Sequence, residues 1–319
     1  MKLIIQIPCY NEAATLPETI RELPKRVEGF STVELAVIDD GSTDDTSAIA
    51  RQLGVQHVVR LPRNRGLAHA FAVGLQTSLE LGADAIVNTD GDNQYRGSCV
   101  VDLVSPILKG EADMVVGDRQ IDTIGHFSTS KKTLQKLGSW VVRWASGTDV
   151  PDATSGFRAL SREAALQLSV FSSYTYTLET IIQAGKKGLA VLSVPVGTNE
   201  RRRDSRLIQS VPKYVVRSAV TILRIFLMYE ALRVFFGMGS LPLVAGLSLL
   251  VRFGYFFLIG QGQGHVQSLV VAAILIVVAF QTFLLGLLAD LIARNRRLHE
   301  EILYRVRKMT FDAGLRATP

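Results

Sequence analysis

The stretch that decides the fold of this chain is Ala85-Ile86-Val87-Asn88-Thr89-Asp90-Gly91-Asp92-Asn93-Gln94-Tyr95. It joins a short apolar run to two carboxylates one residue apart, and residues i and i+2 of a strand share a face. Asp90 and Asp92 can therefore point the same way where the strand ends, and they repel each other unless a cation lies between them. A hard divalent cation with oxygen ligands, shared with a substrate phosphate, fits this chemistry. Taken alone, however, the segment is more typical of an acidic turn.

A regular alternation of strands and helices surrounds this stretch. Short apolar runs predict strands at residues 2–7, 34–38, 57–61, 84–89 and 112–116, and the spacing between them predicts helices from near residue 15 and over 42–53, 66–81 and 100–108. This alternation predicts an α/β fold in which a mostly parallel sheet is covered by helices on both faces. In such sheets, ligands bind outside the carboxyl ends of the strands.

Polar residues gather at four of these predicted strand ends. They are Tyr10, Asn11 and Glu12 after the first strand, Asp39 and Asp40 after the second, Asp90, Asp92 and Gln94 after the fourth, and Asp118 and Arg119 after the fifth. Charged strand ends on one edge of a sheet favour a binding site over an isolated turn. The sequence has neither a Gly-x-Gly-x-x-Gly motif after the first strand nor a Gly-Lys-Ser/Thr loop, so a nucleotide would have to be held by side chains and a metal.

The second part of the chain predicts a membrane hairpin. Residues 234–251 and 266–289 carry no charge, and a bilayer core needs about 20 apolar residues as a helix. The glycine-rich segment 260–265 between them predicts a tight loop, which leaves both ends of the hairpin on one side. Basic residues flank the hairpin at positions 224, 233, 294, 296 and 297. The positive-inside rule therefore predicts that residues 1–200 lie in the cytoplasm.

Composition narrows the class of protein further. The net charge of +6 is attributed to residues facing the membrane, because no basic and aromatic interleaving of the kind that binds RNA is present. The two cysteines, Cys9 and Cys99, lack the spacing of metal ligands and predict no disulfide framework. The apolar run at residues 1–7 is too short for a secretory signal peptide.

In the order in which they occur, the motifs resemble those of the family 2 glycosyltransferases with the A-type fold, and more narrowly the polyprenyl-phosphate glycosyltransferases. The matching pieces are Ile7-Pro8-Cys9-Tyr10-Asn11-Glu12, Val37-Ile38-Asp39-Asp40-Gly41-Ser42, Asp90-Gly91-Asp92-Asn93-Gln94, Gly117-Asp118-Arg119, Asp152-Ala153-Thr154-Ser155-Gly156-Phe157-Arg158 and Arg203-Asp204-Ser205-Arg206-Leu207. The resemblance spans residues 3–230. It implies an A-type, Rossmann-like domain, followed by interfacial and transmembrane helices.

The resemblance also implies roles for the matching residues. Pro8, Tyr10, Glu12, Ile38 and Asp40 would surround the base and ribose of a nucleotide-sugar donor, and Asp90, Asp92 and Gln94, with Gly91 between them, would hold Mg²⁺ or Mn²⁺ against its diphosphate. Arg119 and Lys132 would face the phosphate of the acceptor, and Arg201, Arg203 and Arg206 would come from a loop that closes over the diphosphate. Asp92, Arg119 and Arg203 are the residues expected to take part in catalysis.

Three positions depart from the family pattern. Gly66-Leu67-Ala68 stands where many members have Gly-x-Gly, and Tyr95-Arg96 stands where many have His-Pro. Lys132 replaces an arginine, which removes a bidentate contact to phosphate. These changes leave the reaction class intact and weaken any inference about the particular sugar.

The predicted organisation has four parts. Residues 1–206 would form the cytoplasmic catalytic domain, 207–231 an amphipathic region beside the membrane, 232–290 the transmembrane hairpin (about 234–259 and 266–289) and 291–319 a cytoplasmic tail. The basic and apolar residues of 207–231 favour helices lying in the membrane interface, although packing on the catalytic domain stays open. Trp140 and Trp144 would face either the membrane or the core.

These features predict an inverting, metal-dependent enzyme of the cytoplasmic membrane face. It would transfer a sugar from a UDP- or GDP-linked donor to polyprenyl (undecaprenyl or dolichyl) phosphate. The acceptor phosphate is already anionic, so no strong general base is required, and none of the five histidines lies in a strand-end cluster. Expected partners are the nucleotide sugar, polyprenyl phosphate, membrane lipids and a second copy of the chain, but no nucleic acid.

Two alternatives stay open. A glycosyltransferase could use another acceptor, such as a diacylglycerol or a polysaccharide. Processive synthases carry Gln-x-x-Arg-Trp, however, whereas this chain has Trp140-Val141-Val142-Arg143-Trp144 and only two predicted spans. The other alternative is a non-catalytic membrane protein that binds nucleotide sugar or helps lipids to cross the bilayer; such a protein would not need the acidic cluster.

Overall fold

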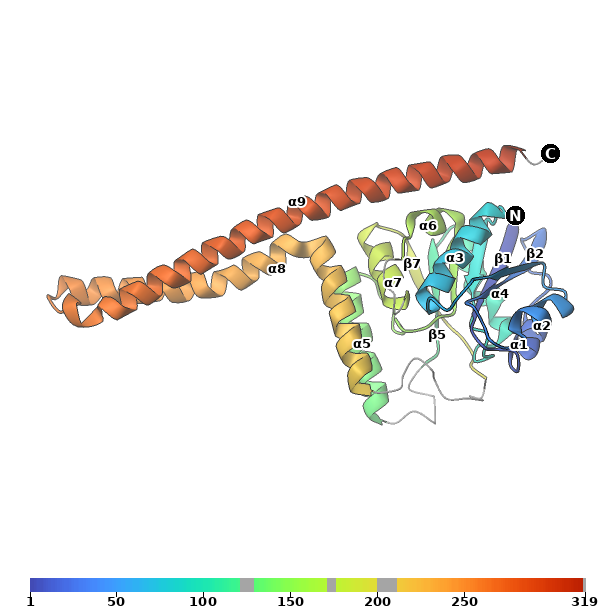
Figure 1. Ribbon diagram of the computed structural model, residues 1–319, viewed down its shortest axis with the longest axis horizontal. Helices are drawn as coiled ribbons and strands as arrows, with labels where there is room; N and C mark the ends of the chain where they lie inside the picture. The colour runs from blue at the N-terminus through green and yellow to red at the C-terminus, as the bar shows by residue number, and fades with distance from the viewer. Residues whose placement is uncertain (121–128, 171–175, 200–210, 318–319) are drawn as a thin grey trace. The chain divides into compact units, whose positions relative to one another are not determined.

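A mostly parallel sheet forms the centre of the N-terminal part of the chain (Figure 1). The computed structural model describes residues 1–120, 129–170, 176–199 and 211–317. Within these residues the sheet has seven strands in the order β3-β2-β1-β4-β6-β5-β7. The strands are β1 (Lys2–Cys9), β2 (Thr32–Asp39), β3 (His57–Arg60), β4 (Ala85–Asn88), β5 (Met114–Asp118), β6 (Arg158–Ser161) and β7 (Val191–Pro195).

Helices connect the strands and continue into the C-terminal part. They are α1 (Leu16–Glu22), α2 (Thr46–Gln52), α3 (Leu67–Glu80), α4 (Val100–Leu108), α5 (Thr129–Ser146), α6 (Arg162–Gln167), α7 (Thr177–Lys186), α8 (Val211–Leu258) and α9 (Val266–Ala317), with short 3₁₀ turns η1 (Gly97–Cys99) and η3 (Gly262–His265). The predicted α/β class and the first five predicted strands are confirmed. The antiparallel strand β6, which pairs with both β4 and β5, and the edge strand β7 were not predicted.

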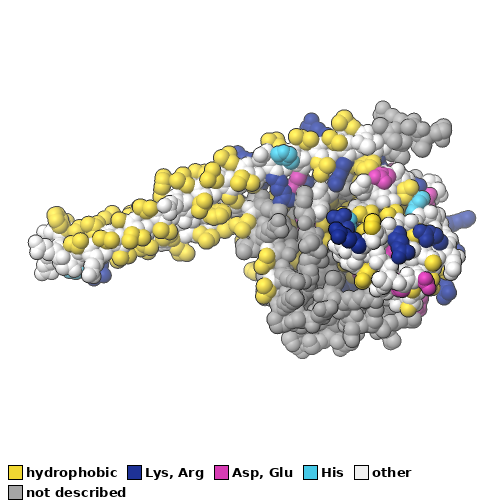
Figure 2. Space-filling view, in the orientation of Figure 1, with side chains coloured by type: hydrophobic (Ala, Val, Ile, Leu, Met, Phe, Trp, Pro, Cys, Tyr) yellow, Lys and Arg dark blue, Asp and Glu magenta, His cyan; other side chains and the backbone are white. Residues whose placement is uncertain are grey.

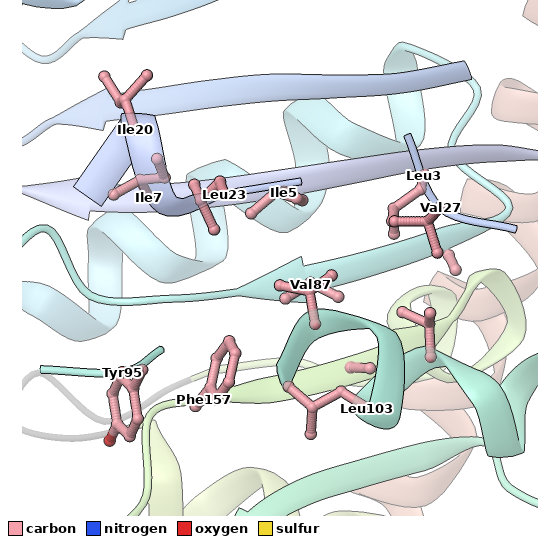
Figure 3. Close-up of a cluster of buried hydrophobic side chains, with 14 of the residues drawn as sticks. Leu3, Ile5, Ile7, Ile20, Leu23, Val27, Val87, Tyr95, Leu103 and Phe157 are labelled. Carbon is pink, nitrogen blue, oxygen red and sulfur yellow. The ribbon is translucent and has the colours of Figure 1, made fainter. Parts of the chain in front are cut away.

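The core lies on both faces of the central strands. Leu3, Ile5 and Ile7 of β1 are fully buried, and their alternate positions put them on one face of the sheet. Ile4, which points to the other face, is fully buried as well. Figure 3 shows them with Val87 of β4 and Leu103 of α4. This burial on both faces explains why β1 reads as a continuous apolar run, as parallel strands covered by helices do.

The register brings the polar strand ends to one edge of the sheet. Cys9 at the end of β1 pairs with Asp39 at the end of β2, and Asp39 pairs with Arg60 at the end of β3. On the other side of β1, Gln6 pairs with Asn88, the last residue of β4. The acidic residues that follow β2 and β4 therefore leave the sheet from the same edge, as the sequence predicts.

Two helices in the C-terminal part are long and apolar enough to cross a membrane. The chain divides into one compact unit of residues 1–222 with 302–319 and another of residues 223–301. The apolar stretches are Tyr229–Leu258 and Gly262–Asp312, and they contain the two predicted spans. Figure 2 shows hydrophobic side chains along both helices. A Cβ atom at Gly239 would lie 2.6 Å from the ring of Phe283, so α8 and α9 pack closely there.

The end of α9 belongs to the first unit and contacts α6. Arg307 donates a hydrogen bond to the carbonyl of Leu168 (3.0 Å) just beyond the end of α6, and Arg162 pairs with Asp312 (3.2 Å). The predicted tail, residues 291–319, is helical as far as Ala317, and part of it contacts the first unit. The predicted amphipathic region begins at residues 207–210, outside the described residues, and continues into α8.

Candidate active site

The acidic motif forms a tight loop directly after β4. Gln94 donates a hydrogen bond from its side-chain amide to the carboxylate of Asp92 (2.8 Å). The carbonyl of Gly91 between the two aspartates accepts hydrogen bonds from Thr15 (2.9 Å) and Thr19 (3.2 Å) of the α1 region. A Cβ atom at Gly91 would lie 2.8 Å from the sulfur of Cys9. The loop is thus fixed from two sides, and position 91 requires glycine.

Without a bound cation, the negative charges of Asp90 and Asp92 repel each other. Burial raises the pKa of Asp90 to about 7; the charge of Asp92 adds to this, and Arg119 opposes it. The available donors, two carboxylates and the amide of Gln94, are oxygen ligands of the kind that Mg²⁺ and Mn²⁺ accept. Among the described residues no group of three or more Asp, Glu, His or Cys side chains could hold a metal alone. The donor set of two carboxylates and one amide fits a hard cation whose remaining ligands would come from a bound substrate.

A network of buried polar residues lies next to Asp90. At Gly156 a Cβ atom would lie 3.0 Å from the Asp90 carboxylate and 3.0 Å from the Tyr176 hydroxyl, so this position has little room for a side chain. Asn88 donates hydrogen bonds to the carbonyl of Gly156 (2.8 Å) and to Tyr176 (2.9 Å). The backbone N–H of Gly156 donates to the hydroxyl of Tyr95 (3.0 Å), so Tyr95, one of the departures from the family pattern, helps to hold this network.

Arg119 is held rigidly by two neighbours. Its guanidinium forms a bidentate pair with Asp152 (2.6 and 2.9 Å) and donates a further hydrogen bond to Thr154 (2.7 Å). Asp152 is fully buried; burial alone would raise its pKa, but Arg119 outweighs it and the pKa is lowered. Among the described residues, these bonds use Nε and Nη2 of Arg119 and fix the plane of its guanidinium.

A second arginine lies behind the acidic pair. Arg158 is fully buried and donates hydrogen bonds to the carbonyls of Ser155 (2.8 Å) and Thr177 (2.8 Å) and to the hydroxyl of Thr180 (2.6 Å). Burial lowers the pKa of Arg158 to about 10, which still leaves it charged at neutral pH. Its charge lowers the pKa of Asp90, and it therefore partly compensates the acidic pair.

Hydrogen bonds to neighbouring segments fix the residues that follow β1 and β2. Glu12 accepts a hydrogen bond from Thr15 (2.9 Å), and its own N–H donates to Thr46 (2.9 Å). Asp40 accepts the backbone N–H groups of Arg65 (2.8 Å) and Gly66 (2.7 Å) at the start of α3. Burial raises the pKa of Asp40, and these two bonds oppose the rise.

The structure brings some of the predicted residues together and leaves others outside its description. Asp90, Asp92, Glu12 and Arg119 are close enough for their charges to influence one another, and Gln94 is bonded to Asp92. Lys132 lies in α5, but its side chain is outside the described residues, as are Arg201, Arg203 and Arg206 entirely. Sequence reasoning assigned no site role to Asn88, Tyr95, Gly156 or Tyr176.

The chain that leaves β7 is fixed beside the acidic motif. Thr198 forms a bridge with Tyr95, and the backbone N–H of Asn199 donates to the carbonyl of Gln94 (2.9 Å). The Glu22 carboxylate accepts hydrogen bonds from the amides of both Asn199 (2.9 Å) and Asn93 (3.1 Å). Thr198 and Asn199, which precede the predicted arginine loop in sequence, are thus anchored to residues 93–95 of the acidic loop.

The sequence of residues 4–168 matches the family model described as glycosyl transferase family 2. The chain belongs to this family. The glycosyltransferase is 28% identical to glycosyltransferase AglJ of Haloferax volcanii over 313 residues, which cover 96% of this chain and 97% of the relative. It is also 28% identical over 211 residues to the polyprenol monophosphomannose synthase of Mycolicibacterium smegmatis, covering 63% of this chain and 78% of the relative.

The fold of this glycosyltransferase also has solved counterparts. Glucosyl-3-phosphoglycerate synthase from Mycobacterium tuberculosis, solved in complex with Mn²⁺, UDP-glucose and phosphoglyceric acid, superposes with a TM-score of 0.57 at 24% identity, covering 70% of this chain and 79% of that chain. This likeness confirms the A-type glycosyltransferase fold that the sequence motifs predict.

Proposed function

We propose that this glycosyltransferase transfers a sugar from a UDP- or GDP-linked donor to a polyprenyl phosphate, such as undecaprenyl or dolichyl phosphate, at a membrane surface. The observation that carries the proposal is the placement of Asp90 and Asp92 at the carboxyl edge of the sheet, next to the fixed guanidinium of Arg119. One edge thus offers ligands for a cation and, beside them, a donor for a second anion. Two apolar helices in the same chain supply a means of reaching a lipid acceptor.

The departure of the nucleoside diphosphate sets the first chemical requirement. Mg²⁺ or Mn²⁺ bound by Asp90, Asp92 and Gln94 would stabilise the negative charge that develops on the diphosphate. Gln94 positions the Asp92 carboxylate through its 2.8 Å hydrogen bond, and Gly156 leaves room for Asp90. Arg201, Arg203 and Arg206, which follow the anchored residue Asn199 in sequence, would add positive charge around the same group.

The attacking group sets the second requirement. A phosphate monoester is anionic at neutral pH, so its oxygen can attack the anomeric carbon without a strong general base. Asp152 and Thr154 hold Arg119 so that its guanidinium can bind this phosphate, and Lys132 is proposed as a second contact. One relative is named a polyprenol monophosphomannose synthase, which supports a polyprenyl phosphate over a neutral alcohol as acceptor.

The donor and acceptor are tested by direct transfer. Purified full-length protein is incubated with undecaprenyl phosphate and a panel of radiolabelled UDP- and GDP-sugars, and the label extracted with the lipid is counted. We expect transfer from at least one donor. Transfer to a diacylglycerol but not to undecaprenyl phosphate would identify the other acceptor class, and transfer to no lipid from any donor would defeat the proposal.

The stereochemistry is tested on the product. Direct displacement by the phosphate oxygen inverts the anomeric carbon, so an α-linked donor is expected to give a β-linked lipid phosphate sugar. NMR of the purified product measures the anomeric configuration. An α-linked product would rule out a single displacement.

A further inference from the structure

Residues 152–156 form a short segment that contacts both sides of the candidate active site. At one end, Asp152 holds the guanidinium of Arg119 through two hydrogen bonds. At the other end, Gly156 lies against Asp90, since a Cβ atom there would be 3.0 Å from the carboxylate. The group proposed to bind the acceptor and the carboxylate proposed to bind the cation are therefore supported by the same stretch of chain.

The backbone of this segment is buried, and a single side chain holds it. Asp152, Ala153 and Ser155 are fully buried, which is unusual for a connecting segment, because its carbonyl and N–H groups lose their contact with water. The carbonyls of Ala153 and Ser155 both accept hydrogen bonds from the guanidinium of Arg158 (3.1 and 2.8 Å). Arg158 therefore fixes the part of the segment that lies between its two functional ends.

Arg158 also joins this segment to α7. Its Nη1 donates hydrogen bonds to the carbonyl of Thr177 (2.8 Å) and to the hydroxyl of Thr180 (2.6 Å). The guanidinium carbon lies 5.6 Å from the centre of the Tyr176 ring. That ring is stacked on Phe71 of α3, with 3.8 Å between the ring centres. The 152–156 segment is thus held against the start of α7 and, through the Tyr176 ring, against α3.

The hydrogen bonds of Arg158 are unusual for a buried charge. Within the described ranges 1–120, 129–170, 176–199 and 211–317, they all go to uncharged oxygen atoms. Burying a charge without an ionic partner is costly, so packing alone is a poor reason to place an arginine here. The guanidinium carries five N–H donors in a fixed planar fork. No other side chain can bind carbonyls of two segments in one fixed geometry in this way.

We propose that Arg158 is a positioning residue that fixes the separation between the bound cation and the phosphate of the acceptor. It holds the 152–156 segment as one rigid piece, with one end against Asp90 and the other against Arg119. The inference rests on the proposed function, because it takes Asp90 as a cation ligand and Arg119 as the contact of the acceptor phosphate. Arg158 itself touches neither substrate.

Loss of this positioning should lower kcat and leave both KM values nearly unchanged. Each substrate can still draw its own end of the segment into place, so the binding of either substrate alone is little affected. The two ends are then no longer held at the separation that the reaction needs, and a misplacement of about 1 Å can cost about 100-fold in rate. A purely electrostatic role would behave differently, because any positive charge at position 158 would fulfil it.

Arg158→Lys separates these two roles, because it keeps the charge and removes the planar fork. Transfer to undecaprenyl phosphate is measured in the full-length protein while each substrate is varied in turn. We expect kcat to fall about 100-fold and both KM values to stay within about threefold of the wild type. A kcat close to that of the wild type, or a loss confined to either KM, would overturn the proposal. Absence of transfer by the wild type would instead defeat the proposed function, and this inference with it.

Thr180→Val gives a second test that leaves the buried arginine in place. It deletes a hydroxyl that accepts a hydrogen bond from Arg158 (2.6 Å) and donates one to the carbonyl of Tyr176 (2.8 Å). We expect kcat to fall about tenfold with unchanged KM values, and Thr180→Ser to restore it. Thr310→Val is the matched control, because it removes only a bond to the carbonyl four residues earlier (2.9 Å) at an exposed position of α9; it should behave as the wild type. An unchanged kcat in Thr180→Val would contradict the positioning role of Arg158.

Discussion

Gly156 is the residue on which the position of Asp90 depends most directly. A Cβ atom there would lie 3.0 Å from Oδ2 of Asp90 and 3.0 Å from the Tyr176 hydroxyl. We predict that Gly156→Ala displaces Asp90 and weakens cation binding about 10- to 100-fold, as loss of a supporting residue does at other metal sites. The measurement is the Mg²⁺ or Mn²⁺ concentration needed for half-maximal transfer. Gly138→Ala, where nothing lies within 4 Å of the new atom, should leave it unchanged.

Asp90 also predicts how stability depends on pH. In the metal-free protein the pKa of Asp90 is about 7, whereas the pKa of an aspartate in an unfolded chain is about 4. Unfolding therefore releases a proton between these values, so the stability of the protein in EDTA should decrease as the pH rises from about 4 to about 7. Thermal unfolding in detergent measures this trend.

Two comparisons check the assignment to Asp90. Asp90→Asn should flatten the pH dependence in EDTA, because the titrating group is gone. Stabilisation of the wild-type protein by Mg²⁺ should grow over the same pH range, because the cation competes with the proton. A stabilisation by Mg²⁺ that shrinks as the pH rises would contradict the placement of a cation at Asp90.

Thr154 tests the role of Arg119 without removing a charge. Thr154→Val deletes the 2.7 Å hydrogen bond to Arg119 and leaves the ion pair with Asp152 in place. Hydrogen bonds to charged groups are worth about 1.5–3 kcal/mol, so we expect the KM for polyprenyl phosphate to rise about 10- to 100-fold. The KM for the nucleotide sugar should not change, and Thr154→Ser should restore the acceptor KM. A rise confined to the donor KM would place Arg119 on the other substrate.

The sequence predicts the residues that carry the charges of the site, but not those that hold them. Asp90, Asp92 and Gln94 lie within five positions, so the spacing of their oxygens is a local property. Gly156 and Tyr176 lie at the same site although they are at least 66 residues away from Asp90 in the sequence. Both are hydrogen-bonded to Asn88, from which they are separated by 68 and 88 positions. The hydrophobic periodicity of the sequence does not predict such long-range contacts.

At the scale of elements, apolar runs predict β1, β4 and β5 because those strands are buried along almost their whole length. The same reasoning does not predict β6. Its four residues begin with Arg158, a charged side chain whose burial depends on carbonyl partners in other segments. β7 lies at the edge of the sheet with partly exposed residues, so its pattern lacks the continuous apolar character of a central strand.

The segment after β7 is joined to the acidic motif through Glu22, and this join can be measured. Glu22 accepts hydrogen bonds from Asn93 and Asn199, so Glu22→Ala and Asn199→Ala should each lower the thermal unfolding midpoint. Because they remove the same bond, we expect the double variant to lose less than the sum of the two, with a coupling of about 0.5–3 kcal/mol. Gln76→Ala, which removes an exposed bond to Glu80, should have little effect. Strict additivity at Glu22 and Asn199 would show that the join contributes nothing.

At the scale of the whole molecule, composition alone predicts the two apolar helices, because a long uncharged run has few other uses. The contact of the C-terminal segment with α6 could not be predicted in this way. Arg307 binds backbone carbonyls near Leu168, and a sequence does not show which backbone carbonyls a side chain will contact. The basic residues of this segment read only as a charged tail.

The central claim is that Asp90 and Asp92 hold a cation that serves sugar transfer to a polyprenyl phosphate. It is tested most directly by measuring transfer to undecaprenyl phosphate by the wild-type protein and by Asp92→Asn, with Mg²⁺ or Mn²⁺ and with EDTA. Asp102→Asn, at an exposed position of α4, is the matched control. We predict that EDTA abolishes transfer, that Asp92→Asn lowers it by at least about 100-fold, and that Asp102→Asn behaves as the wild type. Full transfer by Asp92→Asn, or by the wild type in EDTA, would contradict the account.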